Sequence, residues 1–417
     1  NNMYSILIHF YAFIVSLIAP FHKKARLMRA GQRKTYRILR ANIQQGGQYI
    51  WFHAASLGEF EQGRPMIEKI KANYPQYKIL LTFFSPSGYE VRKNYSGADV
   101  ICYLPFDTPC RVSKFLELAH PVAAVFIKYE FWGNYQRELK KRNIPTFIIS
   151  TIFRREQLFF QWFGTPYRKM LSCFTHLYVQ DEYSKNLLAE YGLRNVTIAG
   201  DTRFDRVQDI RNNAKELPLI DKFVHKENGE KQLTLVVGSS WPQDESFLIP
   251  YFNRNPGMKL IIAPHEIHAE HLSAIETLLK RPAIRLSQVK SEADLQGKDC
   301  LIIDCFGMLS SIYRYGEIAY IGGGFGAGIH NTLEAAVYGV PVLFGPRYHK
   351  FKEAKDLIRV GGGFALSDGK AFEALLDELV SHREKLALAG RAAGDFVHRQ
   401  TGATELILPQ IIEKLKG

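Results

Sequence analysis

Short apolar runs rich in Val, Ile and Phe alternate along most of the chain with helix-length amphipathic stretches. A run that is apolar at consecutive positions fits a strand buried on both faces, and helices between such strands indicate a parallel sheet covered on both sides. In the first half, strands are predicted at residues 49–53, 79–84, 100–104, 122–127, 146–150, 177–180 and 196–199, with helices between them such as 60–73 and 134–142.

The same alternation returns after a polar stretch at residues 205–232, which lacks a strand pattern and is predicted to connect two domains. Further strands are predicted at residues 233–237, 260–263, 284–286, 301–303, 318–321, 340–344 and 363–366, with helices at 371–389 and 403–415. The pattern predicts an α/β protein of two Rossmann-like domains, 22–204 and 233–417, that face each other across a cleft. Ligands of such sheets bind just after the carboxyl ends of the strands.

The chain begins with an apolar segment followed by a basic one. Residues 3–21 contain no Lys, Arg, Asp or Glu, and as a helix they would span about 28 Å, close to the hydrocarbon thickness of a bilayer. Eight Lys or Arg residues and no acid lie between His22 and Arg40, out of a net charge of +13. We expect a membrane anchor helix at 3–21, with its basic flank on the cytoplasmic side against an anionic membrane surface.

Other interpretations of this segment either fit the sequence less well or remain open. A cleaved signal peptide carries its positive charge before the apolar run, whereas here the charge follows it. A buried helix of a soluble domain stays possible, because Ser5, His9 and Ser16 interrupt the apolar run. A nucleic-acid-binding arm explains the basic residues but not the apolar ones, so no nucleic-acid partner is predicted.

Three motifs follow predicted strands in the first half. HAASLGE ends in Glu59 at a helix start, where a carboxylate can act as a general base or simply interact with the helix dipole. KYEFWGN contains Glu130, and its neighbours Phe131 and Trp132 either pack as structural aromatics or support a sugar. GDTRFD contains Arg203, which can reach a phosphate or a carboxylate.

The most specific motif of the second half is the glycine-rich segment 321–346, IGGGFGAGIHNTLEAAVYGVPVLFGP. Glycines let the backbone approach a ligand closely, and a helix predicted from Asn331 to Gly339 offers its free amide groups to a phosphate. Glu334, one turn into that helix, can accept hydrogen bonds from ribose hydroxyls. The segment resembles the dinucleotide fingerprint only loosely, because it follows a late strand, so NAD binding is not predicted.

Two further segments follow strands of the second half, APHEIH at 263–268 and DCFGM at 304–308, and both would face the nucleotide. His265, His268 and His271 suggest a zinc site, but their order does not match H-E-x-x-H, so no metal site is predicted. The chain has five cysteines and no Cys-x-x-Cys pair, which argues against a disulfide framework and fits a reducing compartment.

Taken in order, HAASLGE, YEFW, GDTRFD, the glycine-rich loop with HNTLEAA, and GVPVLFGP resemble the bacterial 3-deoxy-D-manno-octulosonic acid (Kdo) transferases over nearly the whole chain. The resemblance implies a GT-B fold, CMP-Kdo as donor, a lipid A precursor (lipid IVA) of lipopolysaccharide core biosynthesis as acceptor, and inversion at the anomeric carbon. It also implies metal independence, no cofactor besides the donor substrate, and location at the inner (cytoplasmic) membrane with the catalytic domains on the cytoplasmic side.

By position, the resemblance implies that Glu59 is the catalytic base and that Glu130 and Arg203 are transition-state stabilisers. In the second domain it implies a set of CMP-binding residues: His265, Glu266, Phe306, Gly307, Met308, Asn331, Thr332, Leu333 and Glu334.

Several departures from the family pattern indicate a divergent branch. The family commonly has Arg-His at positions 265–266, Pro at 332 and Glu-x-Glu at 128–130, and it often has Lys at 203. The familiar Asn-Ala-Arg-Leu-Ser segment reads Ser-Thr-Ile-Phe-Arg here, at residues 150–154.

Two other classes of function stay open from the sequence. The first is a GT-B transferase with another nucleotide sugar as donor, such as a UDP-hexose, which a comparison of CMP with UDP release would separate. The second is a non-catalytic basic protein that binds membrane surfaces or nucleic acid, with strongly salt-dependent affinity.

Overall fold

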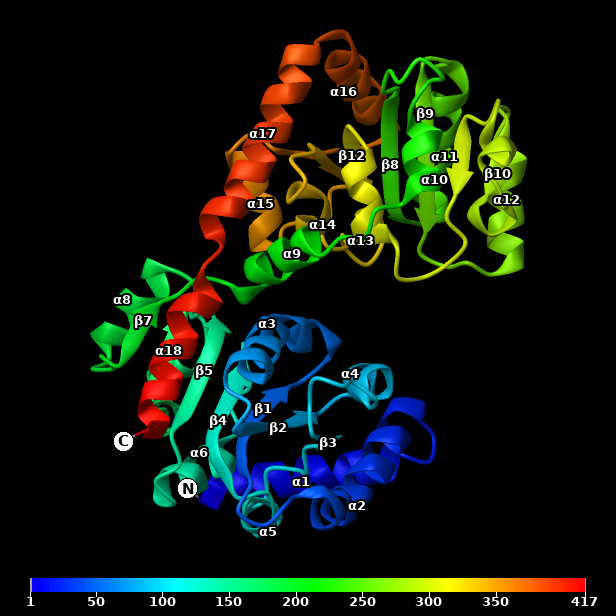
Figure 1. The fold of residues 1–417 in the computed structure, drawn as a ribbon. Coiled ribbons are helices and arrows are strands. Elements are labelled where there is room, and N and C mark those ends of the chain that lie inside the picture. The colour runs from blue at the N-terminus through cyan, green and yellow to red at the C-terminus, as the bar shows by residue number, and fades with distance from the viewer. Residues whose placement is uncertain (1, 417) are drawn as a thin grey trace. The chain divides into compact units, whose positions relative to one another are not determined.

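The computed structural model describes residues 2–416, which form two compact units (Figure 1). Unit 1 contains the chain up to Arg206 together with the segment from Thr401 onward, and unit 2 is Val207–Gln400. Each unit is built on a parallel sheet of seven strands with helices packed on it. The predicted α/β architecture with two Rossmann-like parts is confirmed.

The sheet of unit 1 has the strand order β3-β2-β1-β4-β5-β6-β7. Its strands are β1 (Gln48–Ala54), β2 (Tyr77–Phe83), β3 (Val100–Tyr103), β4 (Pro121–Ile127), β5 (Thr146–Thr151), β6 (His176–Val179) and β7 (Val196–Ile198). Side chains on alternate strand positions fill two cores, with Trp51 and Phe126 on one face and Phe52 and Ile127 on the other. Burial on both faces is why these strands read as continuous apolar runs.

The helices of unit 1 include two that precede the first strand. They are α1 (Asn2–Ile18), α2 (Lys23–Asn42), α3 (Leu57–Asn73), α4 (Pro86–Arg92), α5 (Pro109–Ala119), α6 (Gly133–Lys141), α7 (Thr165–Leu171), α8 (Glu182–Glu190) and α18 (Ala403–Lys416), with a short 3-10 turn η1 (Leu158–Phe160). Helix α9 (Thr202–Asn212) begins in unit 1 and runs across the division between the units.

The sheet of unit 2 has the order β10-β11-β9-β8-β12-β13-β14. Its strands are β8 (Leu233–Ser240), β9 (Met258–Pro264), β10 (Ala283–Arg285), β11 (Cys300–Ile302), β12 (Ile318–Ile321), β13 (Val342–Phe344) and β14 (Gly363–Ala365). Its helices are α10 (Pro218–Val224), α11 (Pro242–Arg254), α12 (Ala269–Leu278), α13 (Leu309–Ile312), α14 (Leu333–Ala336), α15 (Lys352–Arg359), α16 (Gly369–Ser381) and α17 (Arg383–Gln400), with 3-10 turns η2 (Leu286–Gln288), η3 (Glu292–Leu295) and η4 (Tyr313–Tyr315).

The domain boundaries differ from the predicted ones at both ends of unit 2. The polar stretch 205–232 is not a bare connection, because it contains most of α9 and all of α10. The last helix, α18, belongs to unit 1 rather than to a domain 233–417, since its apolar face joins the core beside β1, β2 and β4. The helix predicted at 371–389 is two helices, α16 and α17, separated at His382.

The N-terminal segment forms a shorter helix than the anchor predicted at 3–21. Helix α1 ends at Ile18, just before Pro20, which disfavours helical backbone at the residue preceding it. Within residues 2–416, no single helix is long and apolar enough to cross a bilayer, and α1 passes that test only jointly with α2, at a bend of 116°. Ala12 and Val15 of α1 are buried against Tyr103 and Phe106 of unit 1.

Replacing Ile411 by Ala tests the place of α18 in unit 1. Ile411 is fully buried in the core, so its truncation should lower the free energy of unfolding of unit 1 by about 2–5 kcal/mol. Leu406→Ala is the matched control, because Leu406 lies on the same helix and is 39% exposed; its cost should stay within about 0.5 kcal/mol. Urea unfolding followed by pulse proteolysis measures both, and equal costs would contradict the packing of α18.

Candidate functional site

Glu59 lies in the first turn of α3, directly after β1, where the sequence predicted it. Its carboxylate accepts a hydrogen bond from the hydroxyl of Ser56, the residue that caps this helix. The residue is only partly buried and lies at the carboxyl edge of the sheet. This position suits an acceptor of a proton from a bound hydroxyl.

Glu130 lies in the loop between β4 and α6, and its side chain is 12% exposed. One of its oxygens, Oε2, accepts hydrogen bonds from Nε2 of His53 at 2.9 Å and from Nε1 of Trp132 at 2.7 Å. His53 is completely buried at the end of β1. The first two motifs, HAASLGE and KYEFWGN, are therefore joined directly by the His53–Glu130 contact.

His53 donates to Glu130 through Nε2, because an ionised carboxylate can only accept. The other ring nitrogen, Nδ1, lies 2.8 Å from Oγ1 of Thr82. That oxygen also accepts from the indole N–H of Trp51 at 2.8 Å, and it lies 3.5 Å from the carbonyl oxygen of Phe52. The bonds from His53 and Trp132 together orient the carboxylate of Glu130.

Arg203 lies at the start of α9 and is held by a buried carboxylate. Its Nε and Nη2 each lie 2.8 Å from Oδ2 of Asp201, and its backbone N–H donates to Oδ1 at 2.9 Å. Burial opposes ionisation of Asp201, but the charge and hydrogen bonds of Arg203 outweigh it and lower the pKa of Asp201 below its usual value. Gln62 of α3 also donates to Asp201, at 3.0 Å, which links the third motif to the helix that begins near Glu59.

Two strand ends at this edge carry a conformation that the sequence did not indicate. Lys128, after β4, has φ 66°, and Ser150, in β5, has φ 55°, both in the left-handed region. The N–H of Lys128 donates to the carbonyl oxygen of Ile149 at 2.9 Å, so the two strained positions belong to adjacent strands. Such strain in non-glycine residues concentrates at functional sites.

In unit 2, the glycine-rich loop after β12 packs against the end of β8. A Cβ atom at Gly322 would lie 2.1 Å from the carbonyl oxygen of Ser239, and the N–H of Gly322 donates to the carbonyl oxygen of Gly238 at 2.8 Å. The next N–H, of Gly323, donates to the buried carboxylate of Asp244 at 3.1 Å. Glycine is therefore required at position 322 because the loop lies close to the backbone of Ser239, whether or not a ligand also approaches the loop.

The helix predicted from Asn331 to Gly339 is only the short α14, Leu333–Ala336. The side chain of Asn331 bonds to the start of this helix: its Oδ1 accepts from the backbone N–H of Leu333 and its Nδ2 donates to Glu334, each at 3.1 Å. A helix of one turn has few aligned peptide dipoles, which weakens the predicted role of its start in phosphate binding. The hydroxyl of Thr332 is buried and has no hydrogen-bond partner among residues 2–416.

Three aromatic rings stack at the carboxyl edge of the same sheet. Trp241, His265 and His330 follow β8, β9 and β12, and His265 stacks on both neighbours with centroid distances of 4.6 Å. The indole N–H of Trp241 points to Nε2 of His330 at 3.4 Å. Burial and the nearby His265 lower the pKa of His330, so a neutral imidazole that accepts this hydrogen bond is favoured near pH 7.

The sequence identified His265 but missed Trp241 and His330. The available signal was the position of each residue shortly after a predicted strand. The remaining predicted residues are more open: Glu266 contacts His268 at 3.2 Å, Phe306 is 76% exposed, and Gly307 has φ 86°. The loop that holds Phe306, Gly307 and Met308 follows β11, next to β9, so the predicted CMP-binding segments gather at one edge of unit 2.

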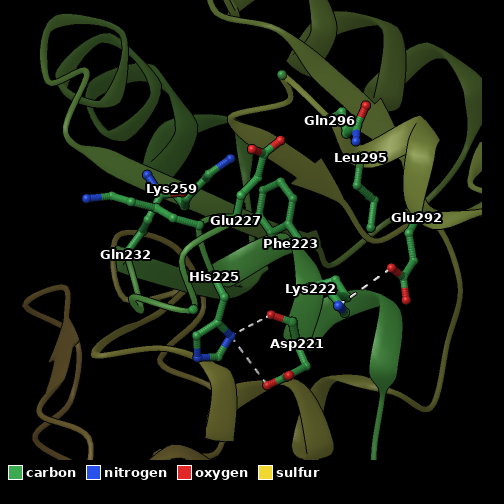
Figure 2. Close-up of a pocket in the computed structure, with 13 residues that line it drawn as sticks. Asp221, Lys222, Phe223, His225, Glu227, Gln232, Lys259, Glu292, Leu295 and Gln296 are labelled. Atoms are coloured by element: carbon green, nitrogen blue, oxygen red, sulfur yellow. Dashed lines mark hydrogen bonds and ion pairs between the residues drawn. The ribbon is translucent and has the colours of Figure 1, made fainter.

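A cavity of about 680 Å³ lies elsewhere in unit 2 (Figure 2). Its walls come from residues 221–232 before β8, from Lys259 in β9 and from residues 292–297 before β11, so it opens at the amino ends of the strands. Figure 2 shows His225 directed at Asp221 and Lys222 directed at Glu292, an ion pair of 3.7 Å. None of the predicted nucleotide-binding residues lines this cavity.

Within the described chain, no three His, Cys, Asp or Glu side chains are grouped in a way that could hold a metal ion. The predicted independence from metals and cofactors stays a prediction.

Known proteins of similar sequence include several Kdo transferases. Residues 25–206 match the family model described as 3-deoxy-D-manno-octulosonic-acid transferase (kdotransferase). The 3-deoxy-D-manno-octulosonic acid transferase of Aquifex aeolicus is 28% identical over 345 residues, which are 81% of this chain and 87% of that protein. The enzyme of the same name from Haemophilus influenzae is 26% identical over 373 residues, covering 87% and 86%.

Solved structures with the same fold include a UDP-GlcNAc 2-epimerase from Neisseria meningitidis, with a TM-score of 0.60, 15% identity, and coverage of 88% of this chain and 100% of that one. MurG from Acinetobacter baumannii has a TM-score of 0.56 at 12% identity, covering 88% and 99%. Together with the two seven-stranded parallel sheets of this chain, the similarity to these structures defines a GT-B type of fold. The chain is a glycosyltransferase that is similar to the Kdo transferases over more than four-fifths of its length.

A pair of alanine substitutions tests the glycine-rich loop. Gly322→Ala should destabilise unit 2 by about 1–3 kcal/mol, because the nearest atoms to the new methyl group belong to the backbone of Ser239 and Ser240 and cannot move aside. Gly326→Ala is the control, since the nearest atom lies 3.7 Å away. Thermal unfolding measures both variants, and a Gly322→Ala protein as stable as the control would refute the close packing of this loop.

Proposed function

We propose that this protein transfers Kdo from CMP-Kdo to a lipid A precursor such as lipid IVA, with inversion at the anomeric carbon. The observation that carries the proposal is that the three motifs of unit 1 meet at one sheet edge. His53 bonds to Glu130, and Gln62, one turn after Glu59, bonds to Asp201 beside Arg203. The relatives named as Kdo transferases align over more than four-fifths of the chain.

In the proposed reaction, Glu59 takes the proton of the acceptor hydroxyl while the hydroxyl oxygen attacks the anomeric carbon of Kdo. The new carbon–oxygen bond forms as the bond from that carbon to the CMP phosphate breaks, and the electron pair leaves with the phosphate. Glu130 and Arg203 have the proposed role of stabilising charge as it develops. The reaction needs no metal ion or cofactor, because side chains supply the base and the charge stabilisation.

The proposed donor site is the carboxyl edge of unit 2. Residues His265, Glu266, Phe306, Gly307, Met308, Asn331, Thr332, Leu333 and Glu334 are assigned to CMP, as the resemblance implies. The stack of Trp241, His265 and His330 adds flat apolar surface beside polar groups, which suits a nucleotide.

We also propose attachment to the inner membrane through the N-terminal helices, with the acceptor reached from the membrane surface. Helix α1 exposes one apolar face, formed by Met3, Ile6, Leu7, Phe10, Phe13 and Leu17. Most of the cations of α2 are exposed and without acids nearby in the sequence, including Lys23, Lys24, Lys34, Arg37 and Arg40. An apolar face beside a basic one is typical of helices that lie in the interface of anionic membranes.

Incubation with CMP-Kdo and a tetraacylated lipid A precursor, followed by mass spectrometry of the lipid, tests the proposal. Lipid that gains the mass of Kdo, with release of CMP, is the expected result. Transfer from a UDP-hexose instead would favour the alternative donor, and salt-dependent nucleic-acid binding without any sugar transfer would favour the non-catalytic alternative.

Glu59→Gln keeps the shape of the side chain and its contact with Ser56 but cannot accept a proton. Turnover should fall about 10²- to 10⁴-fold, as expected for the loss of a general base, while CMP binding, assigned to unit 2, stays nearly unchanged. A circular dichroism melt controls for folding. A folded variant with nearly native turnover would show that Glu59 only stabilises the start of α3, and Glu130 would then be the next candidate for the base.

Glu334→Ala tests the ribose contact. Loss of hydrogen bonds to a charged group should weaken CMP binding by about 1.5–3 kcal/mol, measured by calorimetry. Glu270→Ala is the matched control, since Glu270 occupies the first turn of α12 and is exposed. An unchanged affinity in Glu334→Ala would place the nucleotide elsewhere.

A further inference from the structure

The hydroxyl of Tyr4, in the first turns of α1, is wedged between two parts of unit 1. It donates to Oδ2 of Asp107 at 2.6 Å and accepts from the backbone N–H of Gly133 at 3.0 Å. Gly133 is the first residue of α6 and lies three positions after Glu130. A Cβ atom at position 133 would lie 3.1 Å from Cε1 of the Tyr4 ring, so the ring rests directly against the end of the Glu130 loop.

Asp107 holds the same helix start from the other side. It is fully buried, and its carboxylate accepts from the backbone N–H groups of Asn134 at 3.0 Å and Tyr135 at 2.8 Å. Ser5 of α1 adds a hydrogen bond to the Asn134 side chain at 3.2 Å. One buried carboxylate is therefore shared between α1 and the start of α6, and the position of α6 depends on α1.

The start of α6 in turn fixes Glu130. The side-chain amide of Gln136 donates to the carbonyl oxygen of Glu130 at 3.1 Å. The backbone N–H of Gln136 donates to the carbonyl oxygen of Trp132 at 3.0 Å. The indole of Trp132 then donates to the carboxylate of Glu130. A shift of the first turn of α6 would move both the backbone and the side-chain donor that orient this carboxylate.

A second connection between α1 and Glu130 runs through aromatic rings. Tyr11 of α1 packs on Phe106 at a centroid distance of 5.7 Å, Phe106 packs on Phe84 at 6.0 Å, and Phe84 packs on Trp132 at 4.8 Å. Trp132 is the donor to Glu130. The polar connection and the aromatic one begin at different turns of α1 and reach the same loop.

We propose that α1 is a positioning element of the catalytic site and that the Tyr4 hydroxyl, through Asp107 and the start of α6, holds Glu130 in its working orientation. The inference rests on the proposed function, because it assigns to Glu130 a role in turnover. It adds that the helix with the exposed apolar face also controls the geometry of the transferase site, so that displacement of α1 lowers catalysis.

The test uses full-length Tyr4→Phe with the acceptor dispersed in detergent micelles, so that attachment to a bilayer does not limit the rate. Turnover should fall roughly 10- to 100-fold with little change in the KM for CMP-Kdo, as expected for a misplaced catalytic group. Tyr11→Phe is the matched control on the same helix. The Tyr11 hydroxyl has no hydrogen bond to any residue in the described range 2–416, and Phe keeps the ring contact, so its turnover should be native.

A measurement without substrate separates positioning from general destabilisation. The ¹⁵N–¹H resonance of the Trp132 indole, assigned with Trp132→Phe, reports the bond to Glu130 directly. It should shift in Tyr4→Phe and not in Tyr11→Phe, while the indole resonance of Trp241, in unit 2, stays in place in both.

Native turnover in Tyr4→Phe, or an unshifted Trp132 resonance, overturns the inference even if the wild-type protein transfers Kdo. If the wild-type protein transfers no Kdo, the proposed function fails, and the indole resonance alone decides whether α1 positions Glu130.

Discussion

In each unit, the parallel pairing of strands on both sides of one central strand determines which loops lie next to each other. The neighbours of β1 are β2 and β4, and those of β8 are β9 and β12, so the chain leaves each central strand toward one side and later returns on the other. Ligands of open parallel sheets bind outside the carboxyl ends of the strands, at the position where the chain changes from one side of the sheet to the other. His53 and Glu130 meet there in unit 1, and Trp241, His265 and His330 meet there in unit 2. Side chains far apart in the sequence are thus brought together by topology.

Loops at these edges are irregular, and buried carboxylates satisfy many of their backbone N–H groups. Asp107 serves the start of α6, Asp205 the start of α18, and Asp244 the glycine-rich loop. A buried carboxylate is costly unless several donors surround it. Asp107 shows the balance, because burial raises its pKa to about 6 even though Tyr4 and the N–H groups oppose this rise.

The strands were predictable because burial on both faces leaves a continuous apolar run, which is a local signal. Each of the fourteen observed strands overlaps a predicted one, with ends that differ by a few residues. The motifs of Glu59, Glu130 and Arg203 were also recognisable, since chemistry-bearing residues follow those strands. Partners from other segments, such as Thr82 beside His53 and Gln62 beside Asp201, depend on pairing between distant parts of the chain and leave no periodic pattern in the sequence.

Three further features differ from the sequence prediction. Helix α18 was predicted to continue unit 2, because its apolar periodicity indicates a buried face but not the core against which that face packs. The predicted helix after the glycine-rich loop is interrupted by side-chain bonds of Asn331 to the helix start. The apolar run of α1 does not indicate which of its positions pack on the rest of unit 1 and which are exposed, and the structure shows one face of each kind.

The packing of α1 on unit 1 also affects how this helix could attach to a membrane. If α1 left unit 1 to enter a bilayer fully, Asp107 would lose the hydrogen bond from Tyr4, which stabilises α1 in its docked position. Ala12 and Val15 would leave their apolar contacts with Tyr103 and Phe106. A helix that stays docked and lies in the interface keeps these contacts and buries its second apolar face in lipid. For the proposed membrane attachment, the packing of α1 therefore favours a helix that lies in the interface over one that spans the bilayer, and in the interfacial arrangement α1 and the Glu130 loop remain one structural element.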